Sequence, residues 1–210
     1  MVDLTIVARL VIEGEEQEVR NLVQQAVTEG VTPDKVLSEG LIAGMNVVGE
    51  RMKKHEMFIP EVIRSAKAMN AAMDFLKPLL ETEEVNLGPK LVLGTVKGDL
   101  HDIGKNLVGM MLKGAGFQVV DLGIGVPAER FVQAVVEQEA TVLGMSALLT
   151  TTMPEMTTTI EALKAAGIRE KVRVIVGGAP VSSEYANKIG ADGYARDAAR
   201  AVDKMRELIQ

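Results

Sequence analysis

The spacing of apolar residues changes near residue 88, and this change limits the possible fold more than any other feature of the chain. Before it, apolar residues recur at every third or fourth position, which is the pattern of amphipathic helices. After it, four short apolar runs ("KLVLGTV", "FQVVDL", "TVLGMS" and "VRVIVGG") alternate with amphipathic stretches long enough to form helices. The chain therefore predicts two domains of different architecture, with a boundary between residues 85 and 86.

The first domain, residues 1–85, is expected to be a four-helix bundle. Apolar periodicity predicts helices over residues 3–12, 15–30, 32–54 and 60–80. Gly30 suits the C-terminal cap of the second helix, and Thr32 and Pro33 suit the N-cap and first position of the third. The acidic segment "LETEEVNLGPK" that follows contains Gly and Pro and is typical of a linker.

The second domain, residues 86–210, is expected to be an α/β domain with a doubly wound parallel sheet of the Rossmann or flavodoxin-like kind. Strands that alternate with helices favour this architecture, because parallel strands need a crossover between them. A weaker fifth strand is predicted near "GYA", and a final helix over "ARAVDKMRELI". Ligands in such folds bind at the carboxyl ends of the strands.

Composition excludes several classes of function. The 210 residues contain no cysteine, which rules out disulfides, thiolate zinc sites, iron–sulfur clusters and a cysteine nucleophile. A net charge of −6 and only four Phe and two Tyr give neither the positive charge nor the aromatic platforms that nucleic acids require. No apolar stretch is long enough to cross a membrane, and the N-terminus lacks a basic leader. We therefore expect a cytoplasmic protein.

The segments that follow the four strands are rich in glycine and hydroxyl side chains: "KGDLHDIG", "GIGVP", "SALLTTTMP" and "GGAP". Loops of this kind at one sheet edge predict a site for a bulky ligand. His101 is the strong metal-ligand candidate in this domain. Asp99 lies two residues earlier, close enough to accept a hydrogen bond from the imidazole, which would fix its tautomer and strengthen it as a ligand. Gly104 begins the next helix and leaves room for close approach.

Other interpretations of the same residues fit less well. His101 and Asp102 could form half of a hydrolytic metal site, but such a site needs further ligands. The other histidine, His55, lies in the helical domain among charged residues and is expected to be exposed. A nicotinamide or flavin site would place G-x-G-x-x-G in the first strand-to-helix turn, and neither this motif nor a Walker phosphate loop is present there.

Three motifs in order resemble the cobalamin-binding pattern of methionine synthase and of the corrinoid proteins of anaerobic methyltransferase systems. They are Asp99-x-His101-x-x-Gly104, Ser146-x-Leu148 and Gly177-Gly178. The segment "VGERMKKHEMFIPEVIRSAKAMNAAMDFLKP" resembles the helical cap that covers the upper face of the corrin. The resemblance covers essentially the whole chain. It is strongest to corrinoid subunits that carry methyl groups from methylamines, methanol, betaines or methoxylated aromatics.

The resemblance implies that cobalamin is bound base-off/His-on, with His101 as the lower cobalt ligand and Asp99 hydrogen-bonded to it. It implies a relay in which Asp99 and Thr152 have a catalytic role, handling the proton that accompanies release of His101 on reduction. Met52 and Ile59 match the Phe and Leu that shield the upper cobalt face in methionine synthase. The cofactor-binding residues implied are Gly98, Asp99, His101, Asp102, Ile103, Gly104, Ser146, Leu148, Thr150, Gly177, Gly178, Met52 and Ile59.

The resemblance also implies a methyl carrier that works between other proteins. No residues remain for a donor or acceptor pocket once cap and cofactor domains are assigned, and no cysteine is present to activate a thiol. The expected partners are a substrate-specific methyltransferase, a methyltransferase for a thiol or tetrahydrofolate acceptor, and a reductive activase, with neither nucleic acid nor a membrane. Two alternatives remain: a cobalamin-dependent sensor or regulator, and the small subunit of a cobalamin mutase.

Overall fold

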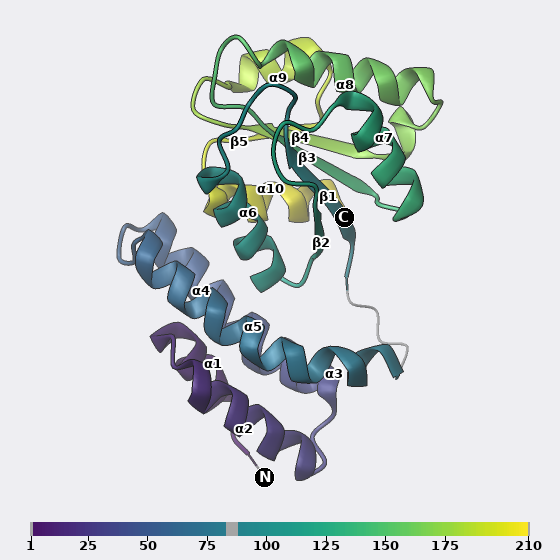
Figure 1. Cartoon of the computed structure of the whole chain (residues 1–210). Coiled ribbons are helices and arrows are strands. Elements are labelled where there is room, and N and C mark those ends of the chain that lie inside the picture. The colour runs from purple at the N-terminus through teal and green to yellow at the C-terminus, as the bar shows by residue number, and fades with distance from the viewer. Residues whose placement is uncertain (1, 83–87, 210) are drawn as a thin grey trace. The chain divides into compact units, whose positions relative to one another are not determined.

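The protein divides into two compact units in the computed structural model, which describes residues 2–82 and 88–209. The first is entirely helical and the second, which starts at Gly88, combines a sheet with helices (Figure 1). We call them the helical unit and the α/β unit. The predicted domain boundary between residues 85 and 86 lies outside the described residues. Over the described ranges, no helix combines the length and apolar character needed to span a membrane.

The helical unit has the predicted arrangement of about four helices. Its elements are α1 (Leu4–Glu13), α2 (Glu16–Thr28), the consecutive segments α3 (Pro33–Lys35), η1 (Val36–Ile42) and α4 (Ala43–Lys53), and α5 (Ile59–Thr82). Asp3 caps α1, since its carboxylate accepts a hydrogen bond from the Thr5 amide at 2.9 Å. α1 packs against η1 and α4, and α2 packs against α5. The apolar stripes of these helices form a buried core that includes Val7, Val11, Val19, Val23, Leu41, Val48, Val62 and Leu76.

Two details of this unit differ from the sequence prediction. The predicted third helix contains a π-helical segment, η1, which no residue in the stretch signals. α5 begins at Ile59, where the Phe58 amide donates to the Glu61 carboxylate at 2.9 Å, and it ends at Thr82. The first residues assigned to the linker are therefore helical. The breakers in that segment, Gly88 and Pro89, lie too far along the chain to end α5 at residue 80.

The α/β unit is built on a five-stranded parallel sheet in the order β2-β1-β3-β4-β5. The strands are β1 (Lys90–Thr95), β2 (Gln118–Asp121), β3 (Val142–Ser146), β4 (Arg173–Gly177) and β5 (Gly193–Ala195). This is the flavodoxin-like, doubly wound order. The predicted fold class and all five predicted strands are confirmed.

Helices cover both faces of the sheet (Figure 1). One face carries α6 (Ile103–Gly114) and α10 (Ala198–Leu208), and the other carries α7 (Ala128–Glu137), α8 (Pro154–Ala165) and α9 (Ser183–Ile189), with the short 3-10 helix η2 (Arg169–Lys171) before β4. Phe131, Met156 and Ile160 form a core with strand residues Leu143 and Val174 beneath α7 and α8. The sequence analysis did not identify α9, because seven residues hold less than two full turns of an apolar pattern.

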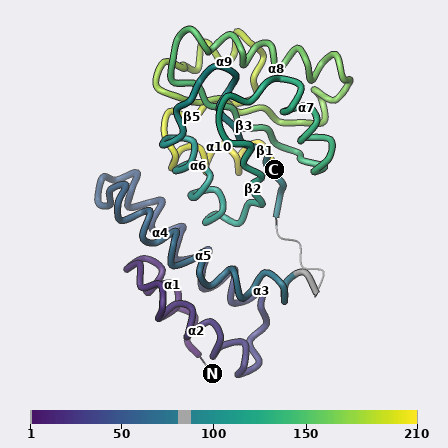
Figure 2. Tube along the Cα trace, in the orientation of Figure 1, coloured from purple at the N-terminus to yellow at the C-terminus, as the bar shows by residue number. Residues whose placement is uncertain are grey.

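Strand register brings the carboxyl ends of three strands level with one another. Thr95 at the end of β1 pairs with Ser146 at the end of β3, which in turn pairs with Gly177 at the end of β4. The loops that follow these strands therefore start from one edge of the sheet, as the chain trace shows (Figure 2). This edge is where the predicted ligand loops gather.

Candidate functional site

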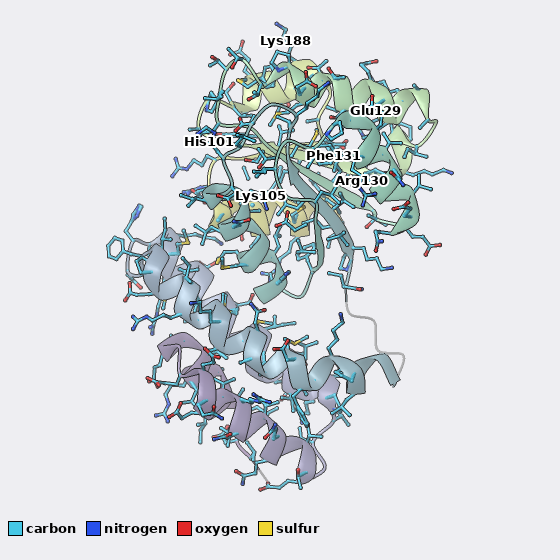
Figure 3. All side chains as sticks on the ribbon, in the orientation of Figure 1. His101, Lys105, Glu129, Arg130, Phe131 and Lys188 are labelled. Carbon is cyan, nitrogen blue, oxygen red and sulfur yellow. The ribbon has the colours of Figure 1, made fainter. Side chains whose placement is uncertain are left out.

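The site lies where the strand order reverses direction. From β1 the chain passes through α6 to β2 on one side, and from β2 it returns to β3 on the other side of β1. The loops after β1 and β3 start side by side but lead to opposite faces, and in doubly wound sheets this is the place where ligands bind. Figure 3 labels His101 in the loop before α6 and Lys105 on the first turn of that helix.

His101 is held by Asp99 through two donors. The main-chain amide of His101 donates to Asp99 Oδ1 at 3.1 Å, and ring atom Nδ1 lies 2.7 Å from the same oxygen. The Asp99 side chain is fully buried, whereas that of His101 is 51% exposed. Because a carboxylate only accepts hydrogen bonds, Nδ1 carries a proton, and Nε2 is the ring nitrogen that a neutral imidazole would leave as an acceptor. Among the residues that the structure describes, Nε2 has no hydrogen-bond partner.

The second carboxylate oxygen of Asp99 joins this loop to the one after β3. Asp99 Oδ2 accepts hydrogen bonds from the Leu148 amide at 2.7 Å, the Leu149 amide at 3.3 Å and the Thr152 hydroxyl at 2.7 Å. One buried carboxylate thus accepts five hydrogen bonds and fixes two loops to each other. The sequence singled out Thr152 and Leu148 as site residues, and both contact Asp99.

These hydrogen bonds lower the pKa of Asp99 and so keep it ionised. Burial raises the pKa of the Asp99 carboxyl, but donors from Leu148, Thr152 and His101 outweigh that effect and place the pKa well below its usual range. Asp99 is therefore a carboxylate at neutral pH. Its charge is matched by N–H and O–H dipoles and by the imidazole.

The glycines predicted for the site differ in what requires them. Gly98 and Gly178 have φ angles of 79° and 125°, and a Cβ on Gly178 would lie 1.8 Å from the Ala147 carbonyl oxygen. A Cβ on Gly177 would lie 2.8 Å from the Ala195 oxygen. Gly104 is different, since it is helical and a Cβ there would meet nothing within 4 Å. No contact with the described part of the chain requires a glycine at that position.

Large apolar side chains are exposed around the His101 loop. Ile103 is 78% exposed and Leu100 is 71% exposed, and a Cβ on Gly125, in the loop after β2, would touch Leu100. We call the exposed apolar side chains after β1, β2 and β3 the apolar rim, which consists of Leu100, Ile103, Ile124, Leu148 and Leu149. Apolar groups clustered beside an accessible imidazole indicate a binding surface for a large apolar ligand.

The other predicted residues occupy varied positions. Asp102 is exposed and accepts a hydrogen bond from the Asn106 side chain at 3.1 Å, and Thr150 is also exposed. The carbonyl of Ser146 accepts from the Val96 amide at 3.0 Å, at the end of β3. Met52, near the end of α4, is half-buried, and Ile59, the first residue of α5, is 45% exposed. These last two belong to the helical unit, as does the exposed His55.

Sequence reasoning missed several residues that shape this edge. Leu100, Ile124 and Leu149 were not selected, although their loops were, because exposure of an apolar residue cannot be read from the sequence. Lys105 is buried, with Nζ 2.5 Å from Asp121 Oδ2 and 2.6 Å from Asn106 Oδ1. This ion pair ties α6 to the end of β2 and carries no sequence signal.

Comparisons with known proteins agree with the geometry. Residues 89–203, more than half of the chain, match the B12 binding domain family, and residues 5–77 match a second B12 binding domain family. The chain is 44% identical over 205 residues to a dimethylamine corrinoid protein of Methanosarcina barkeri, covering 96% of this chain and 95% of that one.

Two solved structures are similar over nearly the whole chain. One is a cobalamin-binding protein from Desulfitobacterium hafniense, with a TM-score of 0.81 and 34% identity over 100% of both chains. The other is the methanol:cobalamin methyltransferase complex from Methanosarcina barkeri, with a TM-score of 0.86 and 32% identity over 97% of this chain and 78% of that one. These similarities confirm the prediction of a corrinoid cofactor.

The residues of the site also fit such a cofactor. His101 is half-exposed, and its Nε2 has no hydrogen-bond partner among the described residues, so it is available to a metal. The apolar rim suits a macrocycle, and a Cβ on Gly104 would meet no described atom within 4 Å. In the residues that the structure describes, no group of three or more His, Asp or Glu side chains is placed to hold a metal by itself. On its motifs, its fold and its relatives, this chain belongs to the family of cobalamin-binding corrinoid proteins.

Proposed function

We propose that this protein binds cobalamin base-off/His-on and carries a methyl group between partner methyltransferases. The observation that carries the proposal is the half-exposed imidazole of His101, whose Nδ1 is held by a buried carboxylate while Nε2 has no hydrogen-bond partner among the described residues. The cofactor supplies a cobalt centre that accepts and donates a methyl group. The protein supplies the lower ligand, a fixed orientation and a protected surface.

Asp99 sets the protonation of His101 in this proposal. Because the pKa of Asp99 is well below its usual range, the proton between Asp99 and His101 stays on Nδ1 and not on the carboxylate. The same hydrogen bond keeps the ring in one orientation whether or not Nε2 is bound to metal. Thr152 supports the charge of this carboxylate, since its hydroxyl donates to Asp99 Oδ2 at 2.7 Å, and we propose that the two residues together handle the proton that accompanies release of His101.

The remaining site residues would contact the macrocycle and the nucleotide tail. The apolar rim would lie against the corrin, and Gly104 would leave room for the displaced tail beside α6. Gly98, Ser146, Thr150, Gly177 and Gly178 line the same sheet edge and remain our proposed contacts. In the helical unit, Met52 and Ile59 are our proposed shield for the upper face, with residues 1–85 as the cap domain and 86–210 as the cofactor domain.

The partners are proposed from what the relatives' names state. A dimethylamine corrinoid protein and a methanol:cobalamin methyltransferase complex support methylamines or methanol as methyl donors. A thiol or tetrahydrofolate would be the methyl acceptor. Donor and acceptor would each be served by a separate methyltransferase, and a reductive activase would reduce cofactor that has become oxidised. These resemblances favour a carrier over a sensor or a mutase subunit.

His101→Ala tests the ligand assignment. In wild-type protein loaded with cobalamin, we expect the visible spectrum of a base-off corrinoid with a histidine ligand, and in the variant the spectrum of one without it. The matched control is His55→Ala, because His55 is the other histidine and lies in the helical unit. A histidine-ligated spectrum that survives in His101→Ala would disprove the assignment.

Gly104→Ala and Gly104→Leu separate stability from ligand binding. A Cβ at position 104 would have no described atom within 4 Å, so neither substitution creates a clash there. Glycine lowers the stability of a helix by up to about 1 kcal/mol. The cofactor-free variants should therefore unfold at the same urea concentration as wild type or a higher one. Cobalamin affinity should fall with side-chain size, by about tenfold or more for Leu, which corresponds to about 1.4 kcal/mol. Equal affinity in all three proteins would show that Gly104 does not leave room for the cofactor.

Asp99→Asn tests the charge of the buried carboxylate in cofactor-free protein. The amide puts N–H groups where the chain already supplies donors, so the free energy of unfolding at pH 7 should fall by about 2 kcal/mol or more. A folded-state pKa below the unfolded value stabilises the protein above pH 4, and this contribution is lost as the pH falls further. The difference between wild type and variant should therefore shrink below about pH 4. Exposed Asp102→Asn should change stability by less than about 0.5 kcal/mol, and a pH-independent difference for Asp99→Asn would contradict the assigned charge.

The carrier role is tested with isotope-labelled methyl donors. Reduced, cobalamin-loaded protein is mixed in turn with purified methyltransferases for methanol and for mono-, di- and trimethylamine, and label in the protein fraction is measured after gel filtration. One donor enzyme should transfer label close to one methyl per chain, and the cofactor-free protein should take up none. Label transfer to free cobalamin but not to the loaded protein, for every donor enzyme, would overturn the proposal.

A further inference from the structure

Thr95 is a buried polar residue directly beneath the His101 loop. It is the last residue of β1, its exposed fraction is 0%, and its hydroxyl donates to the main-chain carbonyl oxygen of His101 at 2.9 Å. The rest of β1 between Lys90 and Thr95 is apolar or glycine. Valine has nearly the same shape and suits a buried strand, so packing alone does not explain a hydroxyl here. The hydrogen bond to the main-chain carbonyl of His101 explains the hydroxyl.

Both main-chain polar groups of Thr95 are also hydrogen-bonded. Its amide donates to the Gly123 carbonyl at 3.0 Å, and its carbonyl accepts from the Val126 amide at 2.9 Å. Close by, the Gly125 amide donates to the Asp99 carbonyl at 3.0 Å. Thr95 therefore lies where the loops after β1 and β2 meet, on an interior strand of the sheet that pairs with β2 on one side and β3 on the other. A hydroxyl held on such a strand has little freedom to move.

His101 is consequently held at three atoms. Its amide and its Nδ1 both contact one oxygen of Asp99, at 3.1 and 2.7 Å. These two contacts share a single anchor, so they fix His101 relative to Asp99 alone. The hydrogen bond from Thr95 is an independent anchor on the opposite end of the residue, just before α6 begins at Ile103.

We propose that Thr95 is a positioning residue for His101. Its buried hydroxyl fixes the main chain of His101 relative to the end of β1. Asp99 then sets the orientation of the imidazole ring, and Thr95 sets the distance of the residue from the sheet. Without the hydroxyl, the carbonyl of His101 loses a buried partner and turns towards solvent, which displaces Nε2. The proposal rests on ligation by His101 and adds a residue that does not itself touch the cofactor.

Thr95→Val and Thr95→Ser test this role. Valine keeps the shape and removes the donor, whereas serine keeps the donor. In cobalamin-loaded protein, we expect Thr95→Val to lose much of the histidine-ligated visible spectrum and to bind cobalamin about tenfold more weakly, the change that a lost buried hydrogen bond of about 1.4 kcal/mol would produce. Thr95→Ser should retain the wild-type spectrum.

A second measurement uses cofactor-free protein. Amide hydrogen exchange of His101 and Gly125 should be faster in Thr95→Val than in wild type and should return towards wild type in Thr95→Ser. The matched control is Thr159→Val, because Thr159 is also buried and its hydroxyl donates to a carbonyl, that of Glu155 at 2.9 Å, within α8. This control should leave both the spectrum and the exchange of the His101 loop unchanged.

The outcomes separate this inference from the proposed function. If Thr95→Val keeps the wild-type spectrum and exchange rates while His101→Ala loses the ligated spectrum, the Thr95 role is wrong and the ligand assignment stands. If His101→Ala keeps the ligated spectrum, the ligand assignment itself fails. Should Thr95→Val not fold, Thr95→Ala takes its place against Thr95→Ser, and equal spectra in those two would overturn the role of the hydroxyl.

Discussion

The buried carboxylate of Asp99 is the interaction on which the site depends. It accepts five hydrogen bonds, two from His101 and three from the loop after β3. A buried charge without partners is unstable, whereas this one is satisfied by donors that the fold holds in place. The same bonds that stabilise the charge fix two loops to each other and set the tautomer of His101. One residue thus converts the ends of two neighbouring strands into a single rigid site.

The strand order makes this arrangement possible. β1 and β3 are adjacent and in register at Thr95 and Ser146, but the loops after them lead to helices on opposite faces of the sheet. Here a carboxylate on the first loop reaches the main-chain amides of the second. The flavodoxin-like order therefore does more than support the site, since it supplies the donors that give Asp99 its charge and His101 its orientation.

The sequence predicted what is local and missed what depends on tertiary contacts. Asp99 and His101 are two residues apart, so their hydrogen bond follows from spacing, and five strands follow from apolar runs and their punctuation. The amide donors at Leu148 and Leu149 are main-chain groups, which any residue carries, so no residue type reveals them. Thr95 reads as an ordinary strand residue until the fold places the His101 carbonyl above it. The same holds for the π-helical segment η1, whose residues would suit an α-helix equally well.

The residues of the site differ in whether contacts within the chain explain them. Asp99 and His101 are hydrogen-bonded to groups of the chain itself, which lowers the cost of ordering them on binding. The apolar rim and Gly104 have no such intramolecular explanation, because exposed apolar side chains and a helical glycine with open space both reduce the stability of the chain alone. A bound cofactor that covers the rim removes that cost, and binding to the folded state alone stabilises it by mass action. The hydrogen bonds therefore hold His101, the proposed metal ligand, in place. The apolar rim, the proposed surface for the macrocycle, would gain stability when the cofactor covers it.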